Sequence, residues 1–287
     1  MQYESGDDKY VEDRRGQGIV GRGLPIGLGG LIVLALLSWA TGTDFLSLLG
    51  PAVQQGAPSD TTTGPVQSSP EEDQLKSLAG AVMTDLNEQW ERLLPGRYRP
   101  TSLVLFRDQV NAEGCGLAQS ASGPFYCPGA QKVYLDLGFY QELKERFGAP
   151  GDFAQAYVIA HEVGHHVQTL LGIESQVRRA QQQRPELENE LSVRLELQAD
   201  CYAGVWGHIA SQPGRFQRER KPELEPGDAE EGLRAAASIG DDRMQKMGGG
   251  VVTPERFTHG SSAQRVTWLK RGLESGSVDA CDTFGTK

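Results

Sequence analysis

The sequence lacks the features that mark several classes of protein. It has no run of lysine and arginine, and its formal net charge is −10, whereas proteins that bind nucleic acid present a basic patch or stripe. We therefore expect no nucleic-acid partner. The four cysteines form no CxxC pair, which argues against a zinc ribbon or a thioredoxin-like motif. Long apolar runs are also scarce, and a single stretch is long enough to cross a membrane.

That stretch comprises residues 23–43, which carry no charge. About 20 such residues span the hydrocarbon core as a helix. Four basic residues precede it and no lysine or arginine follows until Lys76, a bias that predicts a cytoplasmic amino terminus. The sequence thus predicts a single-pass anchor in the plasma (inner) membrane, with the rest of the chain extracytoplasmic. A cleaved signal peptide is the alternative, although no small-x-small cleavage site follows Trp39.

The region after this stretch is poor in residues that build a core. Residues 51–70 contain one charge, no aromatic residue and many Pro, Gly, Ser and Thr residues, which is typical of a flexible tether. The expected organisation is a cytoplasmic segment at 1–22, a transmembrane anchor at 23–43, a linker at 44–70 and one folded domain at 71–287.

The folded domain alternates helical and strand-like patterns. Apolar residues recur at helical spacing over 71–94 and again over about 186–210. Between them, a further helix is expected to start with a capping box at Asp152 and to end at Gly172. Short runs rich in strand-forming residues occupy 101–108 and 131–137. These patterns predict an α+β fold, mainly helical with a small sheet. The run "KVYLDL" within 131–137 could be an edge strand that aligns an extended substrate.

Four cysteines in an extracytoplasmic domain fit an oxidising compartment. They allow three pairings. Cys115 and Cys127 flank a loop with glycine and proline that a local bridge could close, which would leave Cys201 to pair with Cys281. Four free, buried thiols are the alternative.

Histidine is also scarce in this sequence, yet three of the five histidines lie in "AYVIAHEVGHHVQTLLG" (156–172). One helical turn is about 3.6 residues, so His161 and His165 project from one face and can bind one zinc ion. Glu162 lies about 100° around the helix, where its carboxylate can take a proton from a water that the metal activates. The alternative is a helix whose histidines are merely satisfied polar groups. Burial of unpaired imidazoles is costly, however, and Gly164 indicates a close approach by another element.

A third ligand is available further along the chain. Catalytic zinc takes three protein ligands and keeps one open position, and Glu196 in "ELQAD" would complete a His, His, Glu set. Asp200 lies one turn further on and could accept the free ring N–H of a ligand histidine. The alternative is a solvated acidic helix face, but apolar residues surround the pair in the sequence. His259, in a glycine- and serine-rich turn, is the candidate donor to a developing oxyanion.

Several motifs together resemble the bacterial neutral zinc metallopeptidase family, the YpfJ-like proteins: "GCGLA", "GPFYCP", "VYLDLGFY", "HEVGHHVQ", "ELQADCYAGVW", "AAASIGDDRMQ", "FTHGSSAQRVTWLKRG" and "CDTF". The likeness runs from about residue 72 to 284, and the anchor and linker in front have a similar layout. It implies a zincin-like domain of the gluzincin type, in which His161, His165 and Glu196 match the ligand positions and Glu162 the general base. "GCG" departs from the more usual alanine before the first cysteine, a change outside the catalytic positions.

These observations predict a membrane-anchored endopeptidase with one Zn²⁺ per chain, acting on a protein or peptide substrate. Two alternatives stay open: an extracytoplasmic binding module in which zinc only holds helices together, and a zinc amidase that acts on cell-wall material. A site closed by four protein ligands would favour the first. The sequence does not separate a peptidase from an amidase, because both use the same zinc chemistry.

Overall fold

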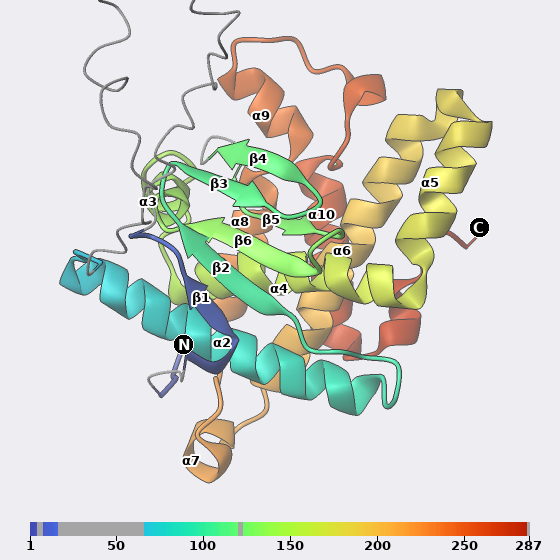
Figure 1. The fold of residues 1–287 in the computed structure, drawn as a ribbon. Helices are drawn as coiled ribbons and strands as arrows, with labels where there is room; N and C mark the ends of the chain where they lie inside the picture. The colour runs from blue at the N-terminus through green and yellow to red at the C-terminus, as the bar shows by residue number, and fades with distance from the viewer. Residues whose placement is uncertain (5–7, 17–65, 120–122, 286–287) are drawn as a thin grey trace, which may run out of the picture. The chain divides into compact units, whose positions relative to one another are not determined.

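The computed structural model describes residues 1–4, 8–16, 66–119 and 123–285 (Figure 1). Within them, a four-stranded sheet has the order β1-β2-β6-β5, where β1, β2 and β6 are parallel and β5 is antiparallel to β6. A separate antiparallel hairpin consists of β3 and β4. The strands are β1 (Val11–Asp13), β2 (Ser102–Phe106), β3 (Gln109–Ala112), β4 (Gly116–Gln119), β5 (Phe125–Cys127) and β6 (Lys132–Asp136).

Helices make up most of the described chain. The α-helices are α2 (Pro70–Leu93), α3 (Gly138–Glu145), α4 (Asp152–Leu171), α5 (Ile173–Gln183), α6 (Glu188–Ala210), α7 (Arg215–Glu219), α8 (Asp228–Ser238), α9 (Asp241–Met247) and α10 (Ser262–Ser275). Short 3₁₀ turns are η1 (Asp8–Tyr10), η4 (Pro185–Leu187), η5 (Pro254–Arg256) and η6 (Val278–Cys281). The described residues therefore form the mainly helical α+β domain with a small sheet that the sequence patterns predict.

The two faces of the sheet are covered differently. Side chains alternate along β2, so Leu103 and Leu105 pack in the core that α2 and α4 share, whereas Val104 and Phe106 pack with residues of the β3–β4 hairpin. All four are at most 1% exposed, which explains why β2 reads as a continuous apolar run. The sheet lies between a helical layer and a hairpin.

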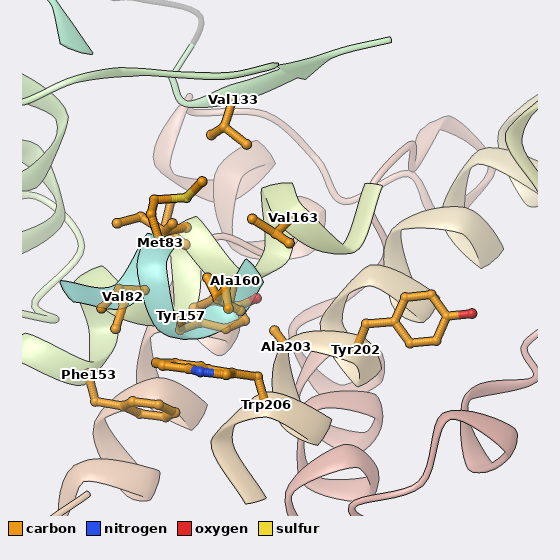
Figure 2. Packing of buried hydrophobic residues seen from close by; sticks show 14 of the residues in the cluster. Val82, Met83, Val133, Phe153, Tyr157, Ala160, Val163, Tyr202, Ala203 and Trp206 are labelled. Atoms are coloured by element: carbon orange, nitrogen blue, oxygen red, sulfur yellow. The ribbon is translucent and has the colours of Figure 1, made fainter. Parts of the chain in front are cut away.

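The main core lies between α2, α4 and α6 (Figure 2). Met83 of α2, Tyr157 of α4 and Trp206 of α6 are at most 1% exposed and belong to one apolar cluster. Small residues, Ala160 on α4 and Ala203 on α6, lie among them and let the helices approach. The core thereby fixes α4 against α6.

Glycines allow the closest helix contacts. A Cβ at Gly164 of α4 would lie 3.1 Å from the Cα and carbonyl oxygen of Ala199 on α6, so the expected close approach at this glycine is confirmed. The contact of α6 with α10 is tighter still, because a Cβ at Gly204 would lie 2.2 Å from the carbonyl oxygen of Leu269 and 2.8 Å from Gly272 Cα.

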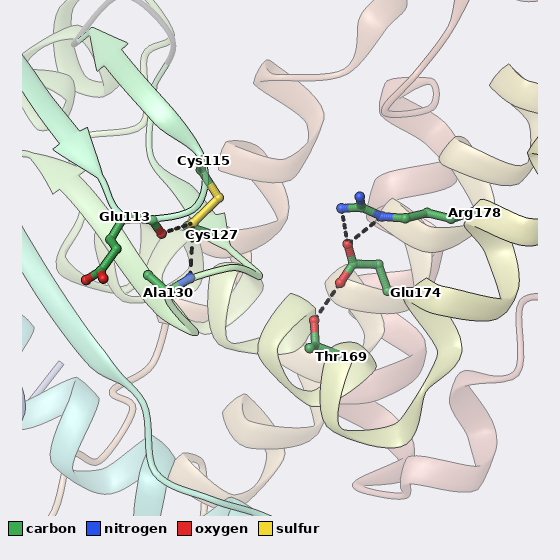
Figure 3. The surroundings of a disulfide bond; sticks show 7 residues. All are labelled: Glu113, Cys115, Cys127, Ala130, Thr169, Glu174 and Arg178. Carbon is green, nitrogen blue, oxygen red and sulfur yellow. Dashed lines mark hydrogen bonds and ion pairs between the residues drawn. A yellow bond between two sulfur atoms is a disulfide. The ribbon is translucent and has the colours of Figure 1, made fainter.

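Both cysteine pairings that the loop argument favours are confirmed. Cys115 and Cys127 form a disulfide that ties the hairpin to β5, as Figure 3 shows. Cys201 of α6 is bonded to Cys281, which holds the carboxyl-terminal segment against this helix. No cysteine is free.

Two local expectations need correction, and one helix was not predicted. The N-cap of α4 is Gly151 and no side chain caps it, so the capping box at Asp152 is wrong, although the helix does end at Gly172, which has φ 74°. The run "KVYLDL" forms β6, which lies inside the sheet between β2 and β5 and is not an edge strand. Helix α5 follows Gly172 directly and has no counterpart in the sequence prediction.

The predicted transmembrane helix at 23–43 lies outside the described residues. In the part of the chain that the structure describes, no helix is both long and apolar enough to cross a membrane. The membrane-spanning element of the predicted fold class finds no support in the described residues, and the fold class is corrected to the α+β domain that they form.

The first residues of the chain extend the sheet. Strand β1 pairs with β2 through Val11, Glu12 and Asp13, and it belongs to the same compact unit as residues 67–287. An ion pair between Glu12 and Lys132 strengthens the attachment.

Gly204 offers a test of the α6–α10 contact. Substituting Gly204→Ala places a methyl group against backbone atoms that cannot rotate away. Overpacking of this kind costs about 1–3 kcal/mol and exceeds the gain in helix propensity, so we expect Tm to fall by about 5 °C in thermal denaturation. Gly248→Ala is the control, because its nearest neighbours lie at 3.6 Å. An unchanged Tm for Gly204→Ala would refute the close contact.

Candidate metal centre

One stripe of α4 faces a cleft of about 640 Å³. The stripe contains Val158, His161, Glu162 and His165, spaced at three and four residues as a helix face requires. The rings of His161 and His165 meet edge to face, with centroids 4.8 Å apart. His161 is 6% and Glu162 8% exposed, so these polar groups reach solvent only through the cleft.

Helix α6 brings a carboxylate to the two imidazoles. Glu196 Oε2 lies 3.1 Å from His161 Nε2, and Glu196 Oε1 lies 3.4 Å from His165 Nε2. All three groups offer a donor atom within 4.8 Å of the others. The ligands of a tetrahedral zinc ion, bound at about 2.0–2.1 Å, are about 3.3 Å apart. The His, His, Glu set therefore fits zinc, with each histidine presenting Nε2.

Buried partners orient His161. Its Nδ1 lies 2.8 Å from Asp200 Oδ1, so Nδ1–H donates to the carboxylate and Nε2 is left for a metal. Asp200 is fully buried, and it also accepts hydrogen bonds from Arg265 at 2.9 Å and from the Tyr157 hydroxyl at 2.6 Å. Burial alone would raise the pKa of Asp200, but the charges of Arg265 and His161 hold it at about 2.

A different contact orients His165. Its Nδ1 lies 2.9 Å from Gln168 Oε1, one turn along the same helix. The amide nitrogen of Gln168 donates to the Leu195 carbonyl at 2.7 Å and to Gln198 Oε1 at 3.1 Å. These bonds fix the amide with its oxygen toward His165, so Nδ1–H donates and Nε2 again faces the metal position.

His259 lines the same cleft as the metal-binding group. Its Nδ1 lies 3.2 Å from Asp241 Oδ1, and Oδ2 of that carboxylate accepts the backbone N–H groups of Thr258, His259 and Gly260 at 2.7–3.0 Å. The hydrogen bond to Asp241 raises the pKa of His259. No described residue forms a hydrogen bond with Nε2 of this ring, so that nitrogen can serve as a donor.

The structure places His161, Glu162, His165, Glu196 and His259 around one cleft and Asp200 behind His161, and three further side chains hold members of this group. Arg265, Gln168 and Asp241 hold Asp200, His165 and His259, respectively. Gln168 could have been found from its i, i+3 spacing to His165. The other two lie in motifs of the family resemblance, but their sequence positions do not reveal which side chain they hold.

A helix-borne His, His, Glu group in a cleft defines the class of zinc hydrolases to which metallopeptidases belong. Residues 1–284 match the family described as "Putative neutral zinc metallopeptidase", and the chain belongs to this family. Membership implies Zn²⁺ as the metal, in agreement with the donor set.

The chain is also similar to individual members. It is 46% identical to the "Uncharacterized protein YpfJ" of Escherichia coli (strain K12), covering 96% of this chain and 95% of that protein. It is 48% identical to the "Uncharacterized protein Rv2575" of Mycobacterium tuberculosis (strain ATCC 25618 / H37Rv), covering 71% of this chain and 69% of that one. No solved structure matches the chain significantly.

Proton competition tests the predicted ligand geometry. Burial opposes protonation of His161, but Asp200 and Glu196 outweigh it and raise its pKa to about 10. A proton on Nε2 therefore competes with zinc at neutral pH, and zinc affinity should fall as the pH falls below this value. Substituting Asp200→Asn removes the main source of the shift. We expect this variant to release fewer protons per zinc at pH 8 and to bind zinc about 10–100-fold more weakly.

The measurement is calorimetric titration with zinc in buffers of different ionisation enthalpy. His208→Gln is the control, because His208 bonds the Leu273 carbonyl and does not line the cleft. Equal proton release by the wild type and the Asp200→Asn variant would show that Asp200 does not govern His161.

Proposed function

We propose that the protein is a zinc-dependent endopeptidase with Glu162 as its general base. The observation that carries the proposal is a three-ligand group that faces a cleft beside an unpaired carboxylate. In the described part of the chain, the group has three members, His161, His165 and Glu196. A structural zinc site would have four protein ligands, whereas a catalytic site keeps one position open.

Glu162 is suited to proton transfer by its surroundings. No described residue donates a hydrogen bond to its carboxylate, although it is 8% exposed and lines the cleft. A buried carboxylate without a protein partner is free to interact with water or substrate. Zinc, when bound, supplies Lewis-acid polarisation of the attacking water and of the scissile carbonyl group. Glu162 accepts the proton of that water and passes it to the leaving amine.

His259 is the proposed donor to the carbonyl oxygen as negative charge develops there. Asp241 holds the ring by Nδ1, which leaves Nε2–H as the donor of a residue that lines the cleft. Asp241 also raises the pKa of His259, so the ring keeps its proton to higher pH. A donor that is oriented before the reaction stabilises the transition state without reorganisation.

An extended peptide suits the wall of the cleft. Phe125 and Tyr126 of β5 line it, and β5 is an outer strand of the sheet. A peptide can add to such an edge through main-chain hydrogen bonds, while alternate side chains enter the cleft. Strand β5 thus takes the alignment role that the sequence prediction gave to "KVYLDL".

The two disulfides support an oxidising compartment as the place of action. We propose that the catalytic domain acts outside the cytoplasm.

Removing the proposed base should separate chemistry from metal binding. Glu162→Gln keeps the size of the side chain but cannot accept a proton, so we expect zinc content to stay at one per chain and cleavage of casein to fall by at least about 100-fold. Glu190→Gln, at the exposed start of α6, is the matched control and should cleave normally. Cleavage that survives in the Glu162→Gln variant would exclude this mechanism.

The His259–Asp241 pair predicts a shift in the pH profile. His259→Ala should lower kcat by about 10²–10³-fold with little change in KM, because the donor acts on the transition state. In Asp241→Asn, the pKa of His259 falls, so the alkaline limb of kcat should move to lower pH. Steady-state kinetics from pH 6 to 10 check both, and an unmoved alkaline limb would show that His259 does not act as the proposed donor.

A further inference from the structure

Strand β5 is short for the role that it has in the cleft. It pairs with β6 through three residues, Phe125 with Tyr134, Tyr126 with Val133 and Cys127 with Lys132. Its other edge has no strand partner among the described residues. Helix α4 carries two of the metal ligands. The position of a peptide on this edge relative to the metal therefore depends on how β5 is held against α4, and the contacts between β5 and α4 determine it.

The principal polar contact of this kind joins Tyr126 to His166. The Tyr126 hydroxyl lies 3.0 Å from His166 Nδ1, and His166 Nε2 lies 2.7 Å from the carbonyl oxygen of Arg99. A carbonyl only accepts, so Nε2 carries the proton. In the neutral ring Nδ1 is then an acceptor, and the Tyr126 hydroxyl donates to it.

The neutral form of His166 follows from its surroundings. The ring is 1% exposed and contacts Tyr98 and Tyr126 with centroids 5.5 and 5.4 Å away. No carboxylate among the described residues forms a hydrogen bond or ion pair with it, and burial in an apolar environment favours the uncharged ring. Both nitrogens are thereby satisfied, one by β5 and one by the segment that precedes β2.

The pleat of β5 directs its side chains to two different anchors. Tyr126 points to the helical face, where it packs with the main core, whereas Phe125 and Cys127 belong to the cluster on the hairpin side. On that side, the disulfide with Cys115 holds the strand to the hairpin (Figure 3). On the helical side, the hydrogen bond to His166 holds it to the helix that carries His161 and His165.

We propose that Tyr126 and His166 are positioning residues that set the distance between the substrate-pairing strand β5 and the metal-binding helix α4. This inference rests on the proposed peptidase function and specifies how the site selects its substrate. A peptide long enough to pair with β5 depends on the contact, and a short substrate that binds only near the metal does not. A displacement of about 1 Å can cost about 100-fold in rate.

Two isosteric changes at His166 separate its two hydrogen bonds. Asparagine places an oxygen near the position of Nδ1 and keeps the acceptor for Tyr126, whereas glutamine places an N–H near Nε2 and keeps only the donor to Arg99. Tyr126→Phe removes the hydroxyl without touching α4. Tyr98→Phe is the matched control, because Tyr98 also packs on His166 but donates its hydroxyl to Asn87.

The experiment uses the full chain and has three readouts: zinc content, amide hydrogen exchange over residues 123–128, and kcat/KM for a long peptide and for a blocked dipeptide. For Tyr126→Phe and His166→Gln, we expect full zinc content, faster exchange in this segment, and kcat/KM lowered about 10–100-fold for the long peptide only. The His166→Asn variant keeps the acceptor for Tyr126, so its kcat/KM for the long peptide should lie much closer to the wild-type value than that of His166→Gln. The double variant Tyr126→Phe/His166→Gln should lose no more than the Tyr126→Phe variant alone, which also removes a side-chain hydrogen bond to Thr169 of α4. Tyr98→Phe should match the wild type in exchange and in substrate preference.

Two outcomes would overturn the inference. In the first, the wild type cleaves the long peptide and the Tyr126→Phe variant cleaves it equally well. In the second, the variants lose zinc, and their kcat/KM falls equally for the long peptide and the blocked dipeptide. Failure of the proposed function has a different signature, since the wild type would then cleave neither substrate while the exchange difference in β5 persisted.

Discussion

The close approach of α4 and α6 is the constraint on which the site depends. Two imidazoles one turn apart define one face of a helix, but they bind a catalytic metal only if a third ligand reaches the same point. Gly164 lets the backbone of α6 pass at Ala199, and this contact places the Glu196 carboxylate 3.1 and 3.4 Å from the two Nε2 atoms. Any residue with a larger side chain at either position would move the carboxylate away from the imidazoles.

A second contact, between α6 and α10, completes the geometry. Gly204 and Gly272 bring these helices together, and Arg265 of α10 then reaches the buried Asp200 of α6. A buried ion pair adds little to stability, because desolvation offsets much of the attraction. The ion pair here acts on orientation. It keeps the Asp200 carboxylate charged and in hydrogen-bond contact with His161 Nδ1, which leaves Nε2 to bind the metal.

The sequence predicts those parts of the site that depend on local geometry. The pair His161 and His165, the neighbouring Glu162 and the pair Glu196 and Asp200 all follow from helical spacing. Arg265 and Asp241 cannot be predicted as partners from local spacing. Each contacts a residue far away in the sequence, and the packing of distant segments decides which one. Gly164, a glycine inside an otherwise apolar helix, does predict that another element approaches α4 closely at this point.

The sheet was harder to predict for a physical reason. Strands β1 and β5 have three residues each, which is too short for an alternating pattern to stand out. Strand β1 also carries Glu12 and Asp13, so it reads as a charged flank although it extends the sheet. Without β5 in the prediction, β6 looks like an edge strand, and without β1 the predicted sheet lacks its first strand.

The zinc site is tested most directly by anomalous X-ray scattering at the zinc absorption edge from crystals of the protein grown with zinc. A catalytic three-ligand site predicts one strong anomalous peak per chain, about 2.0–2.2 Å from Nε2 of His161, Nε2 of His165 and a carboxylate oxygen of Glu196, with no fourth protein ligand. A peak elsewhere, or one enclosed by four protein ligands, would contradict it.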